Sequence, residues 1–217
     1  IGEDVLDGIL RAVDEAERGY AGLVIWQTKE PFSLGANLAA VSPAIAAKEW
    51  DKIDAVVAKF QRTAMRLRHS LIPTVCAVRG MALGGSCEFI LHADRTVAAL
   101  ESYIGLVEVG VGLLPAGGGS KEFAVRAAEE VRRGANGSQI DQFPFIRTYF
   151  QTIATAVVAK SALDAKDLGF LRASDVVVMN ADELLYVAKG QARALADAGY
   201  RPPLPARNIP VAGKTGF

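Results

Sequence analysis

The stretch that decides the fold is Thr74-Val-Cys-Ala-Val-Arg-Gly-Met-Ala-Leu-Gly-Gly-Ser-Cys-Glu88. Its first five residues, Thr74 to Val78, are apolar or β-branched and predict a short buried strand. The glycines that follow predict a loop, because glycine punctuates regular structure, and a helix is expected to begin near Ser86. A buried strand, a glycine-rich loop and a helix in that order are typical of a parallel α/β fold.

The same alternation continues on both sides of this stretch. We expect further short strands at residues 21–26, 95–100 and 176–179. We expect helices at residues 1–19, 43–70 with a break, 121–133, 145–159, 162–168 and 181–198, with Pro43 in the first turn of its helix. Loops are expected at residues 32–37 and 115–120 (the second of them flexible), a linker at 134–139 and an irregular tail from Arg201. This order predicts an α/β protein whose parallel strands are joined by helical crossovers.

Length and composition suit one folded domain, or one domain with an appendage. The chain has 217 residues, and 51% of them are apolar, which is enough to form a substantial core. We expect a core of residues 1–134, a helical region of residues 135–200 and a proline-rich tail of residues 201–217. The chain opens on Ile1 rather than Met, so we expect it to be a fragment of a longer protein.

Charge and hydropathy argue against two classes of partner. The formal net charge is zero and no basic stripe is interleaved with aromatic residues, which argues against nucleic acid. No apolar run reaches membrane-spanning length, so no membrane partner is expected. Cys76 and Cys87 lie in apolar sequence and are expected to be reduced core residues, as in a cytoplasmic protein. Together with His69 and His92 they show no metal-ligand spacing, so we expect no metal site.

Two glutamates are the strongest candidates for chemistry. Glu88 and Glu108 stand twenty positions apart, each beside glycines, in sequence that carries almost no other charge. A carboxylate in an apolar setting loses hydration, and its pKa rises toward neutrality. A pair of such groups suggests a general acid and a general base that serve one reaction.

Two loops of small residues are candidates for an anion site. The loop Phe32–Asn37 follows one buried strand, and the loop Gly80–Ser86 follows another and opens a helix. Small residues expose backbone N–H groups and a helix N-terminus favours negative charge, so two such groups could converge as an oxyanion hole. The alternative is that both loops are tight packing turns, with the glutamates solvated or paired with arginines.

Several motifs occur together in the order typical of one family. These are Phe32-Ser-Leu-Gly-Ala-Asn37, Ala77-Val-Arg-Gly-Met-Ala-Leu-Gly-Gly-Ser-Cys-Glu88 with Ala93-Asp94, Glu108-Val-Gly-Val-Gly-Leu-Leu-Pro-Ala-Gly-Gly-Gly-Ser120, and Ser161-Ala-Leu-Asp-Ala-Lys-Asp-Leu-Gly169. Together they resemble the crotonase (enoyl-CoA hydratase/isomerase) superfamily over most of residues 22–178. The fold that this resemblance implies is α/β, a crotonase-like spiral of ββα turns with terminal helices used in trimer contacts.

The resemblance also implies roles for particular residues. The N–H groups of Ala36 and Gly85 would form the oxyanion hole, and Glu88 and Glu108 fall on the two catalytic glutamates of the hydratases. Substrate contacts are expected from Leu34, Gly35, Gly84, Leu113 and Pro115. The implied activity is hydration of 2-trans-enoyl-CoA to 3-hydroxyacyl-CoA in fatty-acid β-oxidation, a lyase reaction. No cofactor is expected, because coenzyme A is part of the substrate.

The sequence departs from the family pattern in several places. Asn37 replaces the usual Asp, and Leu106-Val107 precede Glu108 where hydratases often have Gln-Pro. The segment between Ser120 and Ser161 is longer by about one helix, and the N-terminal strands of the family are not in this sequence. The long segment and the tail resemble the hydratase portion of a fused 3-hydroxyacyl-CoA dehydrogenase/enoyl-CoA hydratase.

Two alternatives to hydration stay open. One is another acyl-CoA activity of the superfamily, chiefly double-bond isomerisation, which would depend on Glu108 far more than on Glu88. The other is a crotonase-like module without catalytic activity that supports a larger polypeptide. The resemblance further implies a homo-oligomer, a trimer or hexamer, and a dehydrogenase domain in the same full-length chain.

Overall fold

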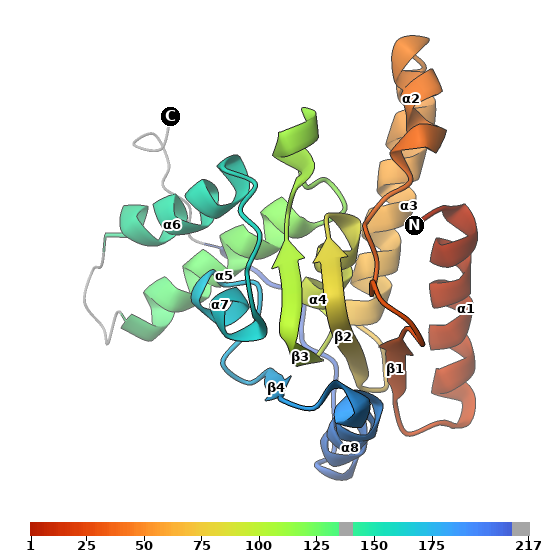
Figure 1. The fold of residues 1–217 in the computed structure, drawn as a ribbon, viewed down its shortest axis with the longest axis vertical. Helices are drawn as coiled ribbons and strands as arrows, with labels where there is room; N and C mark the ends of the chain where they lie inside the picture. The colour runs from red at the N-terminus through yellow and green to blue at the C-terminus, as the bar shows by residue number, and fades with distance from the viewer. Residues whose placement is uncertain (135–140, 210–217) are drawn as a thin grey trace.

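Helices and strands alternate along the chain in the computed structural model, which describes residues 1–134 and 141–209 (Figure 1). The strands are β1 (Leu23–Trp26), β2 (Thr74–Leu83), β3 (Arg95–Gly105) and β4 (Val176–Val178). The α-helices are α1 (Glu3–Gly19), α2 (Leu38–Ala46), α3 (Trp50–Arg68), α4 (Gly85–His92), α5 (Gly119–Gly134), α6 (Phe143–Ala154), α7 (Ala162–Asp167) and α8 (Leu184–Asp197), and the 3-10 helices are η1 (Glu108–Val111) and η2 (Ala181–Glu183). The predicted α/β class is confirmed. No helix within the described ranges is both long and apolar enough to cross a membrane.

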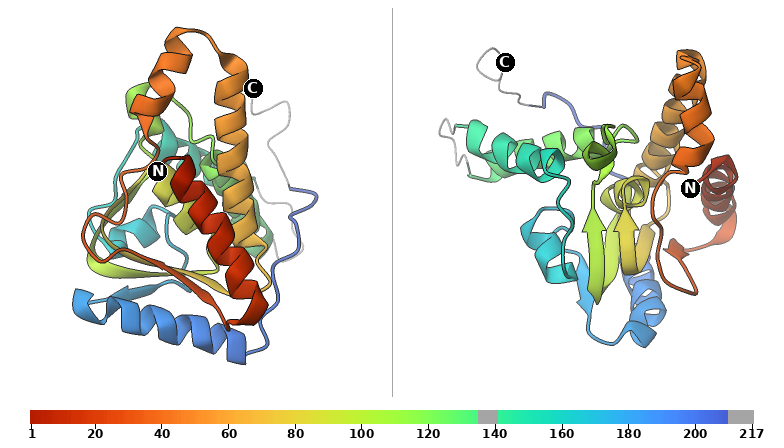
Figure 2. Two further views of the ribbon diagram at one scale, coloured as in Figure 1. Left: turned by 90° about the vertical axis from the view of Figure 1, so that its right-hand side faces the viewer. Right: turned by 45° about the horizontal axis from the view of Figure 1, so that its top comes forward.

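The four strands form one parallel sheet in the order β1-β2-β3-β4. Val75 and Ala77 of β2 pack in an apolar cluster with α8, whereas Cys76 and Val78 pack in the cluster that α4, α5 and α7 close. Helices therefore cover both faces of the sheet (Figures 1 and 2), which explains why the strands are apolar at successive positions. Cys76 is buried and free, as is Cys87, which confirms their predicted state.

β2 and β3 change register partway along their length. The shift falls between the pair Val78–Ala98 and the pair Gly80–Ser102. Beyond it β2 continues to Leu83, and β3 extends past the predicted end at residue 100. The prediction of a loop from Gly80 onward was therefore wrong. Gly80 has φ +62°, so it accommodates the irregularity without ending the strand.

α2 and the outer part of α3 project beyond the body of the molecule, at the end opposite α8 (Figure 2). α2 has no buried residue, and Trp50 at the start of α3 is 60% exposed. The predicted break in this helical region is confirmed between Ala46 and Trp50. Pro43 lies inside α2 rather than in a first turn, so that prediction was wrong.

The segment after α6 also differs from the prediction. α6 ends at Ala154, although the apolar pattern predicts a helix to residue 159. Ala156 has a positive φ of 49°, and Val158 then forms an antiparallel bridge with Gly105 at the end of β3. Pairing with the sheet thus overrides helix propensity here. The linker predicted at residues 134–139 lies outside the described residues beyond Gly134.

Candidate active site

The junction of β2 and α4 lies directly against the loop that follows β1. Ser33 bridges β2, and its carbonyl oxygen accepts a hydrogen bond from the Leu83 N–H at 3.1 Å. Gly35 then packs on the start of α4, because a Cβ on Gly35 would lie 3.2 Å from the Gly85 nitrogen. The structure therefore brings together the two loops that the sequence singled out.

Two backbone N–H groups at this junction have no acceptor among the residues that the structure describes. Within the described residues, neither the Ala36 N–H nor the Gly85 N–H donates a hydrogen bond. Gly85 is the first residue of α4, and Gly84 before it has φ +56°, a conformation that favours glycine. The free donors and the helix dipole favour a negatively charged oxygen beside Gly85.

Glu88 lies one turn further along α4 and is only 3% exposed. Its Oε1 accepts a hydrogen bond from the Gly119 N–H at 2.8 Å, at the start of α5. Burial raises the pKa of the Glu88 carboxyl to about 7; the N–H groups of Gly117–Gly119 oppose the rise, and the negative charge of Glu108 adds to it. A carboxyl with a pKa near 7 can accept and release a proton at neutral pH.

The turn Gly117–Gly119 holds the Glu88 carboxyl and leaves no room for side chains. A Cβ on Gly119 would lie 3.1 Å from Glu88 Oε1, and a Cβ on Gly117 would overlap Oε2. Gly117 and Gly119 are both buried. Residues 115–120, which the sequence predicts to be a flexible loop, are therefore a packed turn that leads into α5.

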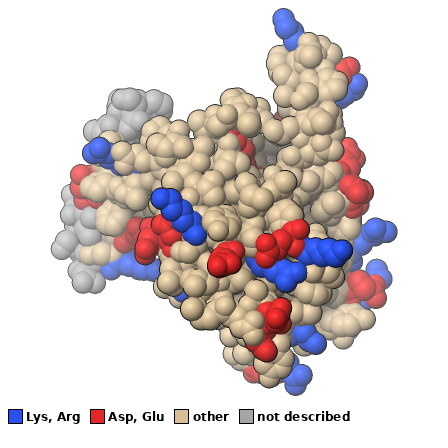
Figure 3. All heavy atoms as spheres, viewed as in Figure 1, with Lys and Arg blue, Asp and Glu red and all other residues tan. Residues whose placement is uncertain are grey.

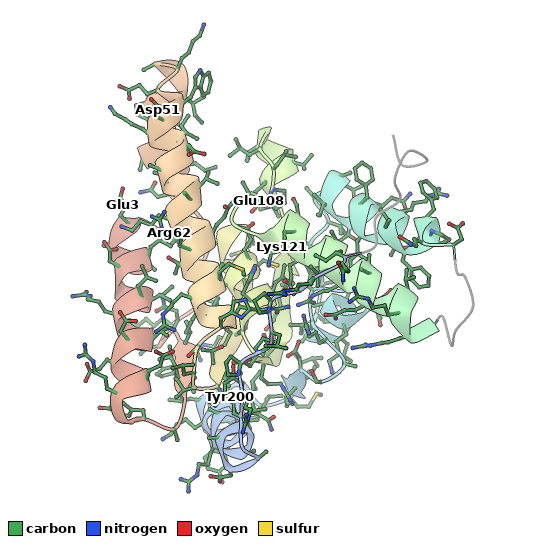
Figure 4. The ribbon with its side chains drawn as sticks, turned by 180° about the vertical axis from the view of Figure 1, so that it is seen from behind. Glu3, Asp51, Arg62, Glu108, Lys121 and Tyr200 are labelled. Carbon is green, nitrogen blue, oxygen red and sulfur yellow. The ribbon has the colours of Figure 1, made fainter. Side chains whose placement is uncertain are left out.

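Glu108 is the first residue of η1, which follows β3 (Figure 4). Its Oε1 would lie 3.3 Å from a Cβ on Gly84, whereas its buried Oε2 has no hydrogen-bond partner among the described residues. Burial raises the pKa of the Glu108 carboxyl, against hydrogen bonds from its own N–H and that of Val107. An unpartnered buried oxygen is costly, so this position suits a ligand that supplies the missing partner.

Both carboxyls and the Gly85 N–H lie at or near the N-terminal end of α4, and Ala36 directly follows Gly35, which packs there. Gly84 touches Glu108, the next residue carries a free N–H, and Glu88 follows one helical turn later. Neither Glu88 nor Glu108 forms an ion pair with any described residue. The alternative that both are paired with arginines therefore does not hold in this part of the chain. Chemically, the arrangement can transfer protons beside an oxygen that becomes negatively charged.

Phe60 of α3 is a component of the site that sequence reasoning missed. Its ring stacks on Phe89 of α4, with centroids 4.9 Å apart and planes inclined by 3°. The same ring lies against Gly85 and Gly117, where a Cβ would strike it. Phe60 therefore contacts both the free N–H residue and the turn that holds Glu88. In the sequence it is one apolar residue on a helix, which is indistinguishable from ordinary core.

A second missed feature is the buried carboxylate of Glu122. It lies 2.8 Å from Arg68, 2.9 Å from Arg172 and 3.2 Å from Lys121. Burial alone would raise the pKa of Glu122, but Arg68 and Arg126 outweigh burial and hold it at about 2. Sequence spacing offers no signal for this cluster, because its cations come from separate elements. Across the described ranges, no three His, Cys, Asp or Glu side chains are grouped to hold a metal ion.

The remaining residues predicted to contact substrate differ in exposure. Leu34 and Leu113 are exposed, whereas Pro115 is buried beside Gly119. A pocket of about 410 Å³ opens between α3 and the start of α5, on the turn that holds Glu88; its lining includes Gln61, Met65, Leu114, Pro115 and Lys121. Figure 3 shows that the face beside the α2–α3 projection carries few charges, with an acidic residue recessed at the base of the projection.

Comparison with known sequences relates the chain to one family. The family described as "Enoyl-CoA hydratase/isomerase" matches residues 3–132. The chain is 41% identical, over all of its 217 residues, to a probable 3-hydroxyacyl-CoA dehydrogenase of Bacillus subtilis and covers 26% of that protein. It is 34% identical over 125 residues, 55% of the chain, to the fatty acid oxidation complex subunit alpha of Idiomarina loihiensis and covers 17% of it. The chain thus spans about a quarter or less of the length of these relatives.

Solved structures share the fold. An enoyl-CoA hydratase of Bacillus anthracis aligns with a TM-score of 0.69 at 21% identity, over 90% of this chain and 67% of that one. A putative enoyl-CoA hydratase/isomerase (crotonase) of Legionella pneumophila aligns with a TM-score of 0.70 at 20% identity, over 92% of this chain and 71% of that one. At these identities the likeness shows the fold alone, and it confirms the predicted crotonase-like architecture.

Proposed function

The chain belongs to the enoyl-CoA hydratase/isomerase family, and on that premise we propose that it hydrates 2-trans-enoyl-CoA to 3-hydroxyacyl-CoA in fatty-acid β-oxidation. One observation supports the proposal: the loop that carries Ala36 packs on the start of α4, beside the Gly85 N–H and the carboxyls of Glu88 and Glu108, and neither the Ala36 N–H nor the Gly85 N–H donates a hydrogen bond among the described residues. Addition of water to a conjugated thioester requires an anion site beside a proton donor and a proton acceptor.

The N–H groups of Ala36 and Gly85 bind the thioester oxygen in this proposal. Negative charge builds on that oxygen as water attacks, so donors fixed in advance stabilise the transition state more than the substrate. Loss of one such donor typically costs on the order of 10²–10³ in rate. Both groups lack an acceptor in the described structure, which leaves them free for the substrate.

The two glutamates divide the proton transfers. Ionised Glu88 takes a proton from water, the water oxygen bonds to the β-carbon, and the π electrons shift onto the thioester oxygen. Protonated Glu108 then gives its proton to the α-carbon, and the thioester carbonyl re-forms. Proton exchange with solvent returns both carboxyls to their starting states. The thioester itself supplies the acidity at the α-carbon, so the proposal needs neither a metal nor a redox cofactor.

One observation favours double-bond isomerisation as a second candidate activity. Glu88 is held by the turn and is 3% exposed, whereas Glu108 has an unpartnered oxygen. A single carboxyl can move a proton between the α- and γ-carbons of an enoyl thioester. Such a reaction would depend on Glu108 and would be insensitive to the loss of the Glu88 carboxyl.

We also propose that the chain works within a longer polypeptide that contains a dehydrogenase domain, and that it forms a homo-oligomer. Support for the dehydrogenase domain comes from the relatives, which are several times longer and carry the names of a dehydrogenase and of an oxidation-complex subunit. The homo-oligomer rests on the family resemblance. A dehydrogenase in the same chain would oxidise the 3-hydroxyacyl product. Detection of that activity in the full-length protein tests this part of the proposal.

The deciding experiment compares the full-length protein with its Glu88→Gln variant on crotonyl-CoA, on a long-chain 2-enoyl-CoA and on a 3-enoyl-CoA. We expect the parent to hydrate the 2-enoyl substrates and the variant to lose about 10²–10⁴-fold in rate, the usual contribution of a general acid or base. A parent that isomerises the 3-enoyl substrate without hydrating the 2-enoyl substrates, and whose isomerisation survives the substitution, would replace hydration by the isomerase alternative. Hydration that survives the substitution would remove Glu88 from the proposed site. No turnover of any substrate by the parent would identify a non-catalytic module.

A further inference from the structure

His92, the last residue of α4, is buried directly behind the turn Gly117–Gly119. Its Nδ1 lies 2.7 Å from the carbonyl oxygen of Glu88, and its Nε2 lies 2.9 Å from Lys121 Nζ. A Cβ on Gly118 would lie 2.6 Å from the ring, so the imidazole and the turn are in direct contact. One side chain thus touches the helix that carries Glu88 and the turn that holds its carboxyl.

The two hydrogen bonds define the tautomer of the His92 imidazole. Lys121 Nζ can only donate, so Nε2 accepts and Nδ1–H donates to the Glu88 carbonyl. Burial lowers the pKa of His92 to about 4, and the positive charges of Lys121 and Arg68 act in the same direction, against the negative charge of Glu122. His92 is therefore neutral at the pH where the pair of glutamates works.

We propose that His92 and Lys121 are positioning residues, which lock the turn Gly117–Gly119 onto α4 so that its N–H groups stay on the Glu88 carboxyl. Lys121 suits this part because it lies in the first turn of α5, two residues after Gly119 (Figure 4). Its Nζ is also 3.2 Å from Glu122 Oε2. The inference deepens the proposed hydration and rests on it for its catalytic consequence.

Loss of the hydrogen bond between His92 and Lys121 has a predictable effect on the pKa of Glu88. The turn is free to shift, its N–H groups bind the carboxylate less well, and the ionised form loses stabilisation. Burial and the charge of Glu108, the other ionisable group that faces Glu88, still oppose ionisation. The pKa of Glu88 therefore rises further. The thioester donors on Ala36 and Gly85 are untouched, so KM is spared while kcat falls.

The test uses the full-length protein with the variants His92→Ala, Lys121→Met and both together. We expect each single variant to lower kcat on crotonyl-CoA by about 10- to 100-fold, the effect of a misplacement near 1 Å. KM stays unchanged, and the acid limb of the pH–rate profile moves to higher pH. The double variant loses little more than either single one, because both act through one hydrogen bond.

Two further variants distinguish a positioning role from nonspecific destabilisation of the fold. His92→Gln offers an amide oxygen to Lys121 and is expected to recover part of the rate. His69→Ala removes the other histidine, whose half-buried ring contacts the Pro203 carbonyl oxygen, and is expected to behave as the parent. Circular dichroism and thermal unfolding establish that each variant is folded.

A readout without substrate keeps the inference independent of the proposed activity. Carbon-13 NMR of labelled glutamate carboxyls, with the Glu88 resonance identified by its absence in Glu88→Gln, reports the Glu88 pKa directly. A higher Glu88 pKa in folded His92→Ala supports the lock, even if the parent proves inactive as a hydratase. An unchanged Glu88 pKa in folded His92→Ala overturns it, including the case in which kcat falls and KM rises together.

Discussion

Glu88 and Glu122 are both buried carboxyls, yet their pKa values move in opposite directions. Burial raises the pKa of Glu88 to about 7, because the polar groups that face it in the described part of the chain are backbone N–H groups and another acid rather than cations. The pKa of Glu122 is held at about 2, because arginines overcome the same cost of burial. The charge of the neighbours, not the depth of burial, therefore decides which carboxyl can exchange protons at neutral pH.

The raised pKa of Glu88 has a consequence for stability. The folded state binds this proton more tightly than the unfolded state, so ionising Glu88 destabilises the fold. The cost is absent below pH 4.5, grows as pH rises toward 7 and is complete above it. We predict that Glu88→Gln raises the free energy of unfolding at pH 8 by about 2–3 kcal/mol and has little effect at pH 4. Urea denaturation of both proteins at the two pH values checks this. Parallel pH dependence in parent and variant would contradict it.

At the scale of elements, the sequence predicts which helices and strands exist better than where they end. β2 and β3 extend past their predicted ends, because Gly80 predicts the start of a loop whereas pairing between β2 and β3 continues beyond it. The helix predicted to residue 159 stops at Ala154, because Val158 pairs with the sheet. In both cases pairing within the sheet overrides the conformation that the local sequence favours.

The candidate site could be predicted only in part, because some of its contacts join elements that are far apart in the sequence. The positions of Ala36, Gly85 and the two glutamates follow from motifs that occur in a fixed order along the chain. Phe60 and His92 could not be found in this way, because their contacts join α3, α4 and the turn before α5, and nothing local marks them.

The glycine turn itself allows a sharp test. Gly117 is buried against the Glu88 carboxyl and the Phe60 ring. We predict that Gly117→Ala lowers hydration by more than about tenfold and destabilises the fold by about 1–3 kcal/mol, because the methyl group displaces both neighbours. Gly190→Ala is the matched control: Gly190 lies in α8 with nothing within 4 Å of an added Cβ, so we expect unchanged activity and about 0.5–1 kcal/mol more stability. Parent-like turnover in Gly117→Ala would remove the turn from the site.

At the scale of the whole molecule, the Glu122 cluster joins elements that build the site. Arg68 comes from α3, Lys121 and Arg126 from α5, and Arg172 from the segment between α7 and β4. The α2–α3 projection and η1 rise at the same end of the molecule, opposite α8 (Figure 1). The cluster therefore anchors the base of the helix from which the projection extends.

Removing the Glu122 carboxylate leaves the buried Arg126 and the half-buried Arg68 and Arg172 without their counter-charge. We predict that Glu122→Ala lowers the free energy of unfolding at pH 7 by about 3–5 kcal/mol, the usual cost of breaking a buried ion pair. Because the folded-state pKa of Glu122 is lowered from 4.5 to about 2, its contribution is complete above pH 4.5 and is lost as pH falls toward 2. The difference between parent and variant in denaturant titrations should therefore shrink below pH 4.5. A difference under about 1 kcal/mol at pH 7, or one that does not change with pH, would contradict this account.

The most direct test of the central claim is hydration of crotonyl-CoA by the full-length protein and its Glu108→Gln variant. The amide keeps the shape of the carboxyl but cannot donate the proton to the α-carbon, so we predict a loss of about 10²–10⁴-fold in kcat with the fold intact. Glu101→Gln, at an exposed position of β3, is the matched control and should hydrate at the parental rate. An active parent whose hydration falls less than about tenfold in Glu108→Gln would contradict the assignment of the site.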